Sequence, residues 1–507
     1  MPAGRLTTLR TGFRFQRRIS ARQPTGPLML KRFSVVLALT LAAPLLSACG
    51  DNAADKQAAK DNRPFTLLAE ADVATARTLE DTALAGNPAW DLLESLTTEI
   101  GPRLAGSPAN ARAVEWALDK FKTLGFDKVW TEPVTIHAWK RIDAQARILS
   151  PYPHEFAVTS LGLSTSTPGA GIEGEVMQFK TIADLQAAPA DAAAGKIVFI
   201  SNRMQRTRDG SGYGPAVAAR SNGASEAGKR GALAVIIRSI GTDSHRLPHT
   251  GAMRYAKDDT TRIPAAALSN PDADILENAL RRGKPIRLYL KIINQDLGEV
   301  ETVNVIGQLT GSEKPDEVVV IGGHLDSWDL GTGAIDDGAG VAITMAAGHL
   351  ISQLETRPRR SLRVIAFAAE EIGLYGGRAY AKAHESELGN HIIGAESDFG
   401  AGRIYALSPK VAESALPVMA EITRVLAPLG IEAGNNDGEG GPDMSAMSRK
   451  GVPMAGLRQD GTSYFDLHHT ADDTFDKVEK AALEQNVAAY AAFSYLALQY
   501  DGRFDGK

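Results

Sequence analysis

Cysteine is almost absent from this chain of 507 residues, because Cys49 is the only one. Beyond Cys49 the sequence has no free thiol and no pair of thiols for an intramolecular disulfide, so the fold does not depend on an oxidising compartment. An excess of positive charge is also missing, since the formal net charge is −5. Contacts to phosphate need a basic face, and this balance argues against nucleic acid as a partner.

The N-terminal region lacks an apolar run long enough to span a membrane. Residues 33–46 are mostly apolar, but fourteen residues are too few for a comfortable span. Lys31 and Arg32 precede this run and Leu46-Ser47-Ala48-Cys49 ends it, which gives the basic, apolar and small-residue parts of a secretory signal. A cysteine at the end of such a signal resembles the lipobox of bacterial lipoproteins, in which the cysteine becomes the acylated first residue after cleavage.

These features predict an exported protein. Residues 1–48 are the expected leader and signal peptide, with Met29 favoured as the true start, and Cys49 is the expected lipidation site. Gly50 rather than an acidic residue follows the cysteine, which favours sorting to the outer membrane. Residues 49–63 are polar without an apolar period, as expected of a tether. We therefore expect a protein that faces the bacterial periplasm and contacts the membrane through its lipid anchor only.

Five histidines and carboxylates have the residue types of a metal site: His324, Asp336, Glu371, Asp398 and His469. Imidazole and carboxylate are the usual zinc ligands other than thiolate, and a hydrolytic site also leaves one position open for water. One carboxylate can bridge two ions, which together hold the attacking water and the carbonyl. We expect two zinc ions bridged by Asp336. The first ion takes His324 and Asp398, and the second takes Glu371 and His469.

Three further acids are expected to assist these ligands. Glu370 stands beside a ligand and is the expected general base, which accepts a proton from the attacking water and passes it to the leaving amine. A ligating histidine commonly donates its other N–H to a carboxylate. Asp326 follows His324 by two residues and Asp473 follows His469 closely, so these two acids are the expected outer partners of the histidines.

The pattern of apolar residues indicates an α/β fold with a mixed, mostly parallel sheet flanked by helices. Residues 317–321, 362–367 and 391–395 are predicted buried strands, and residues 341–351 and 375–384 between them are predicted helices. Ligands of open α/β sheets bind beyond the carboxyl ends of the strands. The proposed ligands follow the three strands, so the sequence places them at one edge of the sheet.

The chain is predicted to be one domain interrupted by another. Residues 64–137 begin the catalytic domain with helices over 90–100 and 110–124. Residues 138–294 change to short β-runs, such as 197–200 and 233–237, separated by glycine and proline turns. Residues 295–507 complete the catalytic domain and end with a helix over 481–500. The insert is expected to be either scaffold or a cover for the substrate, with equal weight.

Each acidic or histidine cluster has an ordinary explanation by itself. A His-x-Asp sequence is usually a surface loop, and paired acids such as Asp336-Asp337 often begin a helix, where the dipole favours negative charge. Four such clusters at consecutive strand ends are hard to obtain by accident. His349 and His384 lie on predicted helices and are interpreted as structural. The loop 438–443 is either a receptor for a substrate amine or an ordinary turn.

Several motifs resemble those of the zinc aminopeptidase and glutamate carboxypeptidase family. They are G-G-H-L-D from Gly322, D-D-G-A-G from Asp336, A-E-E from Ala369, E-S-D from Glu396 and the pair His468-His469. Stretches outside the site are similar too: G-P-R-L-A-G-S from Gly101, G-K-I-V from Gly195 and P-H-T-G from Pro248. The resemblance implies the zinc exopeptidase fold, two zinc ions, the ligand and base roles given above, and an insert similar to a protease-associated domain.

The resemblance also implies small unblocked peptides as substrates, dipeptides above all, and is compatible with a homodimer. Many relatives have a tyrosine before the final histidine to stabilise the oxyanion, and here either His468 or Tyr464 takes that role. Arg378, Arg449 and Arg458 are available for the substrate carboxylate. The alternatives are an aminopeptidase acting on longer peptides, a single-zinc enzyme like glutaminyl cyclase, and a non-enzymatic relative like the transferrin receptor, which the five intact ligand positions disfavour.

Overall fold

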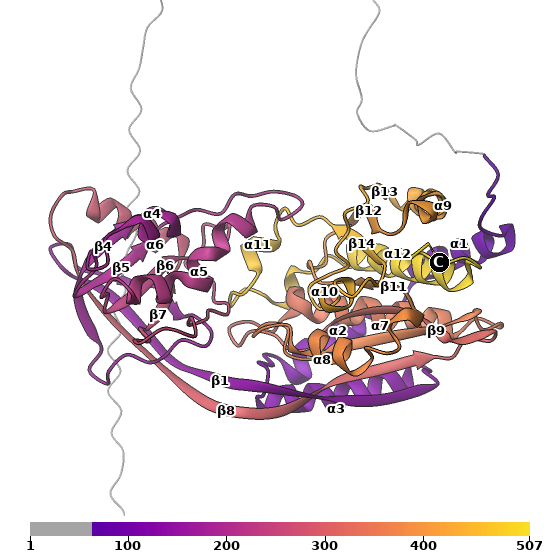
Figure 1. Cartoon of the computed structure of the whole chain (residues 1–507), viewed down its shortest axis with the longest axis horizontal. Helices are drawn as coiled ribbons and strands as arrows, with labels where there is room; N and C mark the ends of the chain where they lie inside the picture. The colour runs from indigo at the N-terminus through magenta and orange to yellow at the C-terminus, as the bar shows by residue number, and fades with distance from the viewer. Residues whose placement is uncertain (1–62, 507) are drawn as a thin grey trace, which may run out of the picture. The chain divides into compact units, whose positions relative to one another are not determined.

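One continuous sheet of 14 strands runs through the computed structural model, which describes residues 63–506 (Figure 1). Its order is β13-β12-β14-β11-β9-β10-β8-β4-β5-β6-β7-β3, and β1 pairs with β8 and with β2 beside this path. The predicted signal peptide, Cys49 and nearly all of the predicted tether lie outside the described residues. None of the helices in residues 63–506 is long and apolar enough to cross a membrane.

Three parallel strands carry the predicted site, as the sequence indicated: β9 (Lys314–His324), β10 (Arg360–Phe367) and β11 (His391–Glu396). β10 and β11 pair with opposite edges of β9, so the chain reverses its direction across the sheet at β9. Such a switch point opens a crevice at the carboxyl ends of the strands. The helices that follow β9 and β10 are α7 (Ala339–Ser352) and α8 (Tyr375–Ala383), which confirms both helix predictions to within a few residues.

Helices and the remaining strands complete the catalytic part. The N-terminal helices are α1 (Glu70–Ala85), α2 (Ala89–Ser95), which continues as a π-helical turn over Leu96–Ile100, and α3 (Pro108–Thr123). Ser107 caps the N-terminus of α3, because its side chain accepts a hydrogen bond from the Asn110 N–H, and Pro108 takes the first helical position. Towards the C-terminus lie β12 (Ile404–Lys410), α9 (Leu416–Leu426), β13 (Glu432–Ala433), α10 (Ser445–Ser448), β14 (Met454–Gln459), α11 (Tyr464–Leu467) and α12 (Lys480–Gln499).

Two strands of 23 residues each, β1 (Lys128–Ser150) and β8 (Arg287–Leu309), pair antiparallel and run from the catalytic part into the insert (Figure 1). The predicted insert boundaries fall inside this ribbon, where Ala138 pairs with Gly298 and Asn294 with Arg141. The insert strands therefore continue the catalytic sheet. They are β2 (His154–Phe156), β3 (Val158–Ser160), β4 (Ile172–Phe179), β5 (Lys196–Ile200), β6 (Ala234–Arg238) and β7 (Ala265–Leu268).

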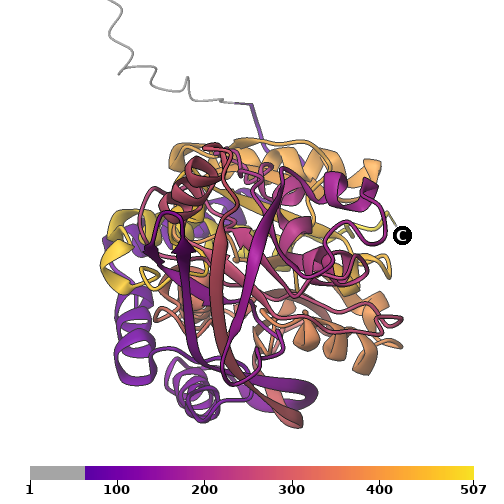
Figure 2. The same ribbon diagram turned by 90° about the vertical axis from the view of Figure 1, so that its left-hand side faces the viewer.

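The insert also contains three helices that its sequence did not indicate: α4 (Ile182–Ala187), α5 (Tyr213–Gly228) and α6 (Asn270–Leu280). Figure 2 looks onto the insert and shows helices on either side of its strands. Alternate residues of β5 divide between them, because Val198 and Ile200 pack with α5 and Ile197 and Phe199 with α6. The buried residues of α5 are mostly alanine and glycine, with Arg220 and Ser225 and no large apolar residue. No helical apolar period therefore marked this helix in the sequence.

Candidate active site

The predicted ligands come together at the carboxyl ends of the parallel strands. His324 is the last residue of β9, and Asp336 lies in the turn that leads into α7. Glu371 follows β10, Asp398 follows β11 by two residues, and His469 follows α11. Four of the five residues thus lie at the end of a strand or in the loop that follows it, and His469 approaches them from the loop after α11. The sheet order, rather than closeness in sequence, therefore gathers the five side chains.

The carboxylate of Asp336 stands between the two histidines. Its Oδ1 lies 3.0 Å from Nε2 of His324, and its Oδ2 lies 3.2 Å from Nε2 of His469. Nε2 of His324 also lies 3.5 Å from Oδ1 of Asp398, and Nε2 of His469 lies 3.0 Å from Oε2 of Glu371. The five side chains thus form two groups that share Asp336, which is the grouping expected of a bridging carboxylate.

The donor atoms fit cations. Ligand atoms of His324, Asp336 and Asp398 lie within 4.8 Å of one another, and so do those of Asp336, His468 and His469. Oε1 of Glu371 is buried and has no hydrogen-bond partner among the described residues. Burial without a partner is costly for a carboxylate oxygen, and a cation would relieve that cost.

Burial, together with the repulsion between neighbouring carboxylates, raises the pKa of most of the acids of the site. Burial and the carboxylate of Asp336 raise the pKa of Glu371 well above its usual value, and burial raises the pKa of Asp398 as well. Burial, with the carboxylates of Asp398 and Glu371, raises the pKa of Glu370 in the same way. Burial opposes ionisation of Asp336 too, but the hydrogen bonds from His324 and His469 outweigh it and lower that pKa. The group is short of positive charge, as a metal site without its ions would be.

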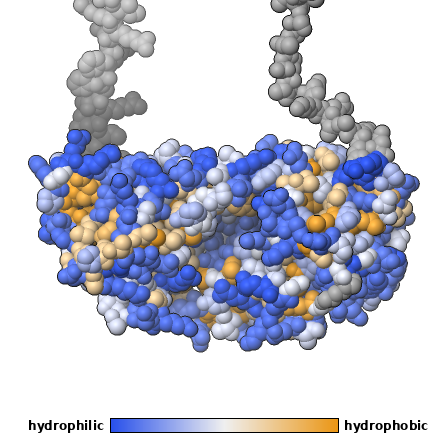
Figure 3. Space-filling model, turned by 45° about the horizontal axis from the view of Figure 1, so that its top comes forward, coloured by the Kyte–Doolittle hydropathy of each residue, from blue (hydrophilic) through white to orange (hydrophobic). Residues whose placement is uncertain are grey.

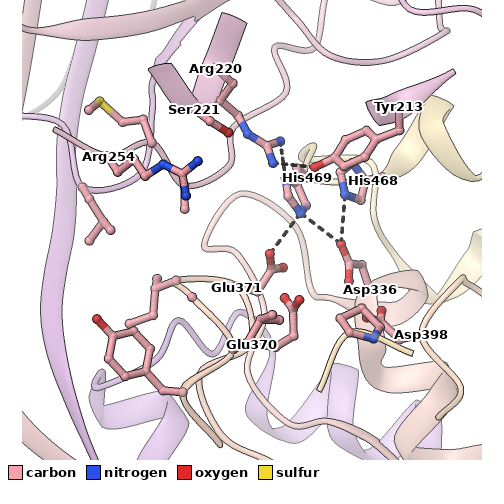
Figure 4. A pocket seen from close by; sticks show the side chains of 18 of the residues that line it. Tyr213, Arg220, Ser221, Arg254, Asp336, Glu370, Glu371, Asp398, His468 and His469 are labelled. Atoms are coloured by element: carbon pink, nitrogen blue, oxygen red, sulfur yellow. Dashed lines mark hydrogen bonds and ion pairs between the residues drawn. The ribbon is translucent and has the colours of Figure 1, made fainter. Parts of the chain in front are cut away.

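A cavity of about 700 Å³ opens over these residues. Glu370 and Glu371 lie on one side of it, and Tyr213, Arg220 and Arg254 of the insert lie on the other (Figure 4). The face drawn in Figure 3 is hollowed near its middle, and hydrophilic side chains border the recess. Among the three arginines that the sequence offered for a substrate carboxylate, Arg378 lines this cavity and the other two do not. Arg458 instead pairs with Asp437 at 2.7 Å.

Several known proteins are similar to this chain in sequence and in structure. Residues 304–494 match Peptidase family M28. Carboxypeptidase Q of Bos taurus is 35% identical over 412 residues, which cover 81% of this chain and 85% of that protein. The chain belongs to peptidase family M28. The crystal structure of a Peptidase M28 precursor from Shewanella amazonensis is 50% identical, with a TM-score of 0.84, and the match covers 86% of this chain and 98% of that one.

A more distant structure shows how far the fold extends. An aminopeptidase from an Aneurinibacillus species is 22% identical with a TM-score of 0.59, and the match covers 86% of this chain and 98% of that chain. The α/β fold with its mostly parallel sheet is therefore that of the M28 exopeptidase structures. This M28 chain is an enzyme, a metallopeptidase, which argues against the receptor-like alternative and against a cyclase.

Asp326 contacts both a predicted ligand, His324, and the predicted base, Glu370. The sequence predicted that its carboxylate would accept from His324, but its backbone carbonyl does so instead. The Nδ1–H of His324 donates to the backbone carbonyl of Asp326 at 3.0 Å, while the nearer carboxylate oxygen of Asp326 lies 3.6 Å away. The carboxylate accepts the backbone N–H of Glu370 at 3.1 Å. Asp326 therefore fixes the orientation of His324 through its main chain and the position of Glu370 through its side chain.

Asp473 is not the partner of His469, in contrast to the prediction. Its carboxylate oxygens accept the backbone N–H groups of Ile335 at 2.6 Å and Asp336 at 3.2 Å. Arg103, from the motif G-P-R-L-A-G-S, is fully buried nearby and donates to the carbonyls of residues 325, 332 and 333. Both side chains hold the loop between His324 and Asp336. Asp473 and Arg103 bind backbone groups, which no sequence pattern marks. The sequence could therefore not assign the roles of these two side chains.

The insert holds the histidine pair. The Nδ1–H of His469 donates to the carbonyl of Thr250 at 3.2 Å. The neighbouring His249 is buried, with its Nδ1 2.7 Å from the carbonyl oxygen of His468 and its Nε2 2.7 Å from the carboxylate of Asp243. The motif P-H-T-G from Pro248 was the only sequence signal for this contact. The insert therefore positions a predicted ligand, a role beyond that of a scaffold.

The sequence offers two residues, His468 and Tyr464, that could stabilise the oxyanion. His468 stacks on His469 with ring centroids 3.5 Å apart, and its Nε2 lies 3.7 Å from Oδ2 of Asp336. Tyr464 lines the same cavity. The insert adds a third candidate that the sequence did not reveal, the hydroxyl of Tyr213, which accepts a hydrogen bond from Arg220 and lies opposite Asp336 (Figure 4). A hydroxyl that accepts from a guanidinium keeps its own proton free to donate.

Proposed function

We propose that this M28 peptidase is a zinc-dependent exopeptidase that hydrolyses small unblocked peptides, dipeptides above all. The observation that carries the proposal is Asp336 between two groups of zinc-type donors at the base of a cavity. His324 and Asp398 would hold one zinc ion, and Glu371 and His469 the other. Bound zinc would polarise the peptide carbonyl and lower the pKa of the attacking water. Imidazole and carboxylate without thiolate suit zinc in a hydrolytic site.

Glu370 is the group that moves the proton. It lies beside Glu371 at the cavity (Figure 4), and its backbone N–H is fixed by the carboxylate of Asp326. Its carboxylate accepts the proton of the attacking water and transfers it to the leaving amine. Burial and the neighbouring carboxylates of Asp398 and Glu371 raise its pKa.

Charge in the cavity favours a peptide with two free ends. The acids around Asp336 attract the α-amine, and the arginines on the opposite wall attract the α-carboxylate. Arg254 is exposed and forms no ion pair or side-chain hydrogen bond among the described residues, whereas Arg220 is engaged with Tyr213 and the carbonyl of Thr250. We therefore assign the carboxylate to Arg254, with Arg378 as the second candidate in the same cavity. The curated relative is named a carboxypeptidase, which agrees with cleavage near a free end.

Removal of metal tests this proposal. Chelation should abolish hydrolysis of free dipeptides, and added zinc should restore it, with close to two zinc ions per chain by elemental analysis. Free dipeptides should be cleaved well, and N-acetylated dipeptides and casein poorly, because one end then lacks its charge or cannot fit. Turnover that persists in metal-free protein would contradict the metal mechanism. Efficient cleavage within casein would contradict the exopeptidase assignment and leave the metal site intact.

We further propose that Cys49, which lies outside the described residues, carries the lipid anchor. The support is the signal-like sequence before it and its place as the only cysteine of the chain. Each buried CH₂ of an acyl chain contributes about 0.8 kcal/mol to membrane binding, and more than one chain is needed for stable anchoring. Cys49→Ser should lose acyl labelling and move from the membrane to the soluble fraction, with the catalytic domain still active. Unchanged membrane partition would rule out anchoring at this residue.

A further inference from the structure

A second cavity of about 640 Å³ adjoins the catalytic one. The two share four lining residues, Leu163, Met253, Arg254 and Tyr375, so Arg254 stands at their junction. The remaining walls of the second cavity come from the β1–β8 ribbon and from two insert loops: His137, Trp139, Ser164, Thr165, Ser166, Tyr255, Arg262, Asn294 and Asp296. Its size falls within the usual range for small-molecule sites.

Two arginines of the second cavity, Arg254 and Arg262, have no ion-pair partner among residues 63–506. Asn294 accepts and donates within the loop 164–166, and the Nε1–H of Trp139 donates to the carbonyl of Ser164 at 3.1 Å. Asp296 pairs with His137 at 2.8 Å. Arg262 lies over the ring of Tyr255 at 5.3 Å and forms no ion pair within residues 63–506. These two unpaired guanidinium groups suit a carboxylate rather than an amine.

We infer that Arg254 sets the length of the peptide, by holding the carboxylate of a dipeptide in the catalytic cavity and closing the way into a second subsite for longer peptides. This inference rests on the proposed function. An extended peptide advances by roughly 3.3–3.6 Å per residue. With the amine fixed near the acids, each added residue moves the carboxylate past Arg254 towards Arg262. A tripeptide or tetrapeptide then occupies the second cavity and loses its pairing with Arg254.

The experiment compares unblocked alanine peptides that differ only in length. Zinc-loaded wild type, Arg254→Ala and Arg254→Gln are assayed with dialanine, trialanine and tetraalanine, and kcat and KM are measured for each. We expect wild type to prefer dialanine. In both variants the KM for dialanine should rise about tenfold or more, the scale of one hydrogen bond to a charged group, with a smaller change in kcat. Trialanine should be affected less, so the ratio of its kcat/KM to that of dialanine rises about tenfold.

Two controls identify the cause. Dialanine amide lacks the carboxylate, so its KM should be the same in wild type and Arg254→Ala. Arg287→Ala removes an exposed arginine of β8 that lines neither cavity and should leave the length preference unchanged. In the double variant Arg254→Ala/Arg262→Ala, the relative gain on trialanine should disappear, because the second subsite has then lost its cation.

The inference is overturned if Arg254→Ala and Arg254→Gln lower kcat/KM for dialanine and trialanine by the same factor. It is also overturned if the gain on trialanine survives in the double variant, since Arg262 would then not be the second anchor. A wild-type protein that binds zinc but cleaves none of the three peptides would contradict the proposed function itself. The two failures are therefore distinguishable in one set of assays.

Discussion

Glu370→Gln should lose hydrolysis of free dipeptides by roughly 10²–10⁴-fold, the usual contribution of a general base, and keep its zinc. Glutamine has the shape of glutamate but cannot accept the proton of the attacking water. The backbone N–H of residue 370 still donates to Asp326 in this variant. Among residues 63–506, Glu370 forms no ion pair with either candidate histidine ligand, whereas Oε2 of Glu371 lies 3.0 Å from Nε2 of His469. Steady-state kinetics and elemental analysis of the same preparation measure both effects.

Glu371→Gln is the matched variant for this experiment. It changes the neighbouring residue in the same chemical way, but its side chain contacts His469, so we expect weaker zinc binding together with lost activity. The two variants should therefore differ in metal content and resemble each other in turnover. If Glu371→Gln kept both zinc ions and lost activity, while Glu370→Gln lost zinc, the roles of base and ligand would be exchanged.

The sequence was sufficient for the part of the site that lies on regular strands. The part of β9 from Val318 to His324 is buried, as are β10 and β11, and each contains an apolar run. Such runs are recognisable because parallel strands covered on both faces contain few polar residues. Each of these strands ends where a His or acidic cluster begins. Since parallel strands direct their carboxyl ends to one edge, the convergence of His324, Glu371 and Asp398 followed from the strand order alone.

Contacts between distant segments could not be predicted in the same way. His249 and Thr250 reach the His468–His469 pair through the insert, and nothing in the spacing of residues 249 and 469 marks that approach. Arg254 is one of many surface arginines in the sequence, and only the cavity distinguishes it. The insert helix α5 was missed for a related reason, because an alanine and glycine face has no large apolar residues to set a period.

The boundary of the insert shows a further limit of sequence patterns. The change to short β-runs after residue 138 marked a new domain, but β1 and β8 each continue for 23 residues through the predicted boundaries. Each of these strands contributes to the catalytic part and to the insert. Its composition does not change where it passes from one to the other. The insert and the catalytic part are therefore joined by antiparallel pairing of β1 with β8 from Lys128–Gln308 to Ser150–Arg287.

Asp336→Asn should have the largest effect on metal binding, because it alters both groups of donors at once. Oδ1 of Asp336 faces His324 and Oδ2 faces His469, and an amide replaces one of these acceptors with a donor and removes the charge. Zinc affinity should fall by more than the roughly 10–100-fold that loss of an outer hydrogen-bond partner costs. Titration of zinc-free protein with a competing chelator measures this, and peptide hydrolysis should be lost in parallel.

Two other variants serve as controls for the effect of Asp336→Asn on zinc affinity. Asp473→Asn weakens the hydrogen bonds to the backbone of Ile335 and Asp336 and removes the charge near Arg103, but it changes no proposed ligand. Its loss of zinc affinity should therefore stay within about 10–100-fold. Asp316→Asn removes an exposed carboxylate of β9 far along the strand from His324 and should bind zinc as wild type does. If Asp336→Asn released only one ion and held the other with unchanged affinity, Asp336 would belong to a single metal. The two donor groups would then be neighbours without a bridge.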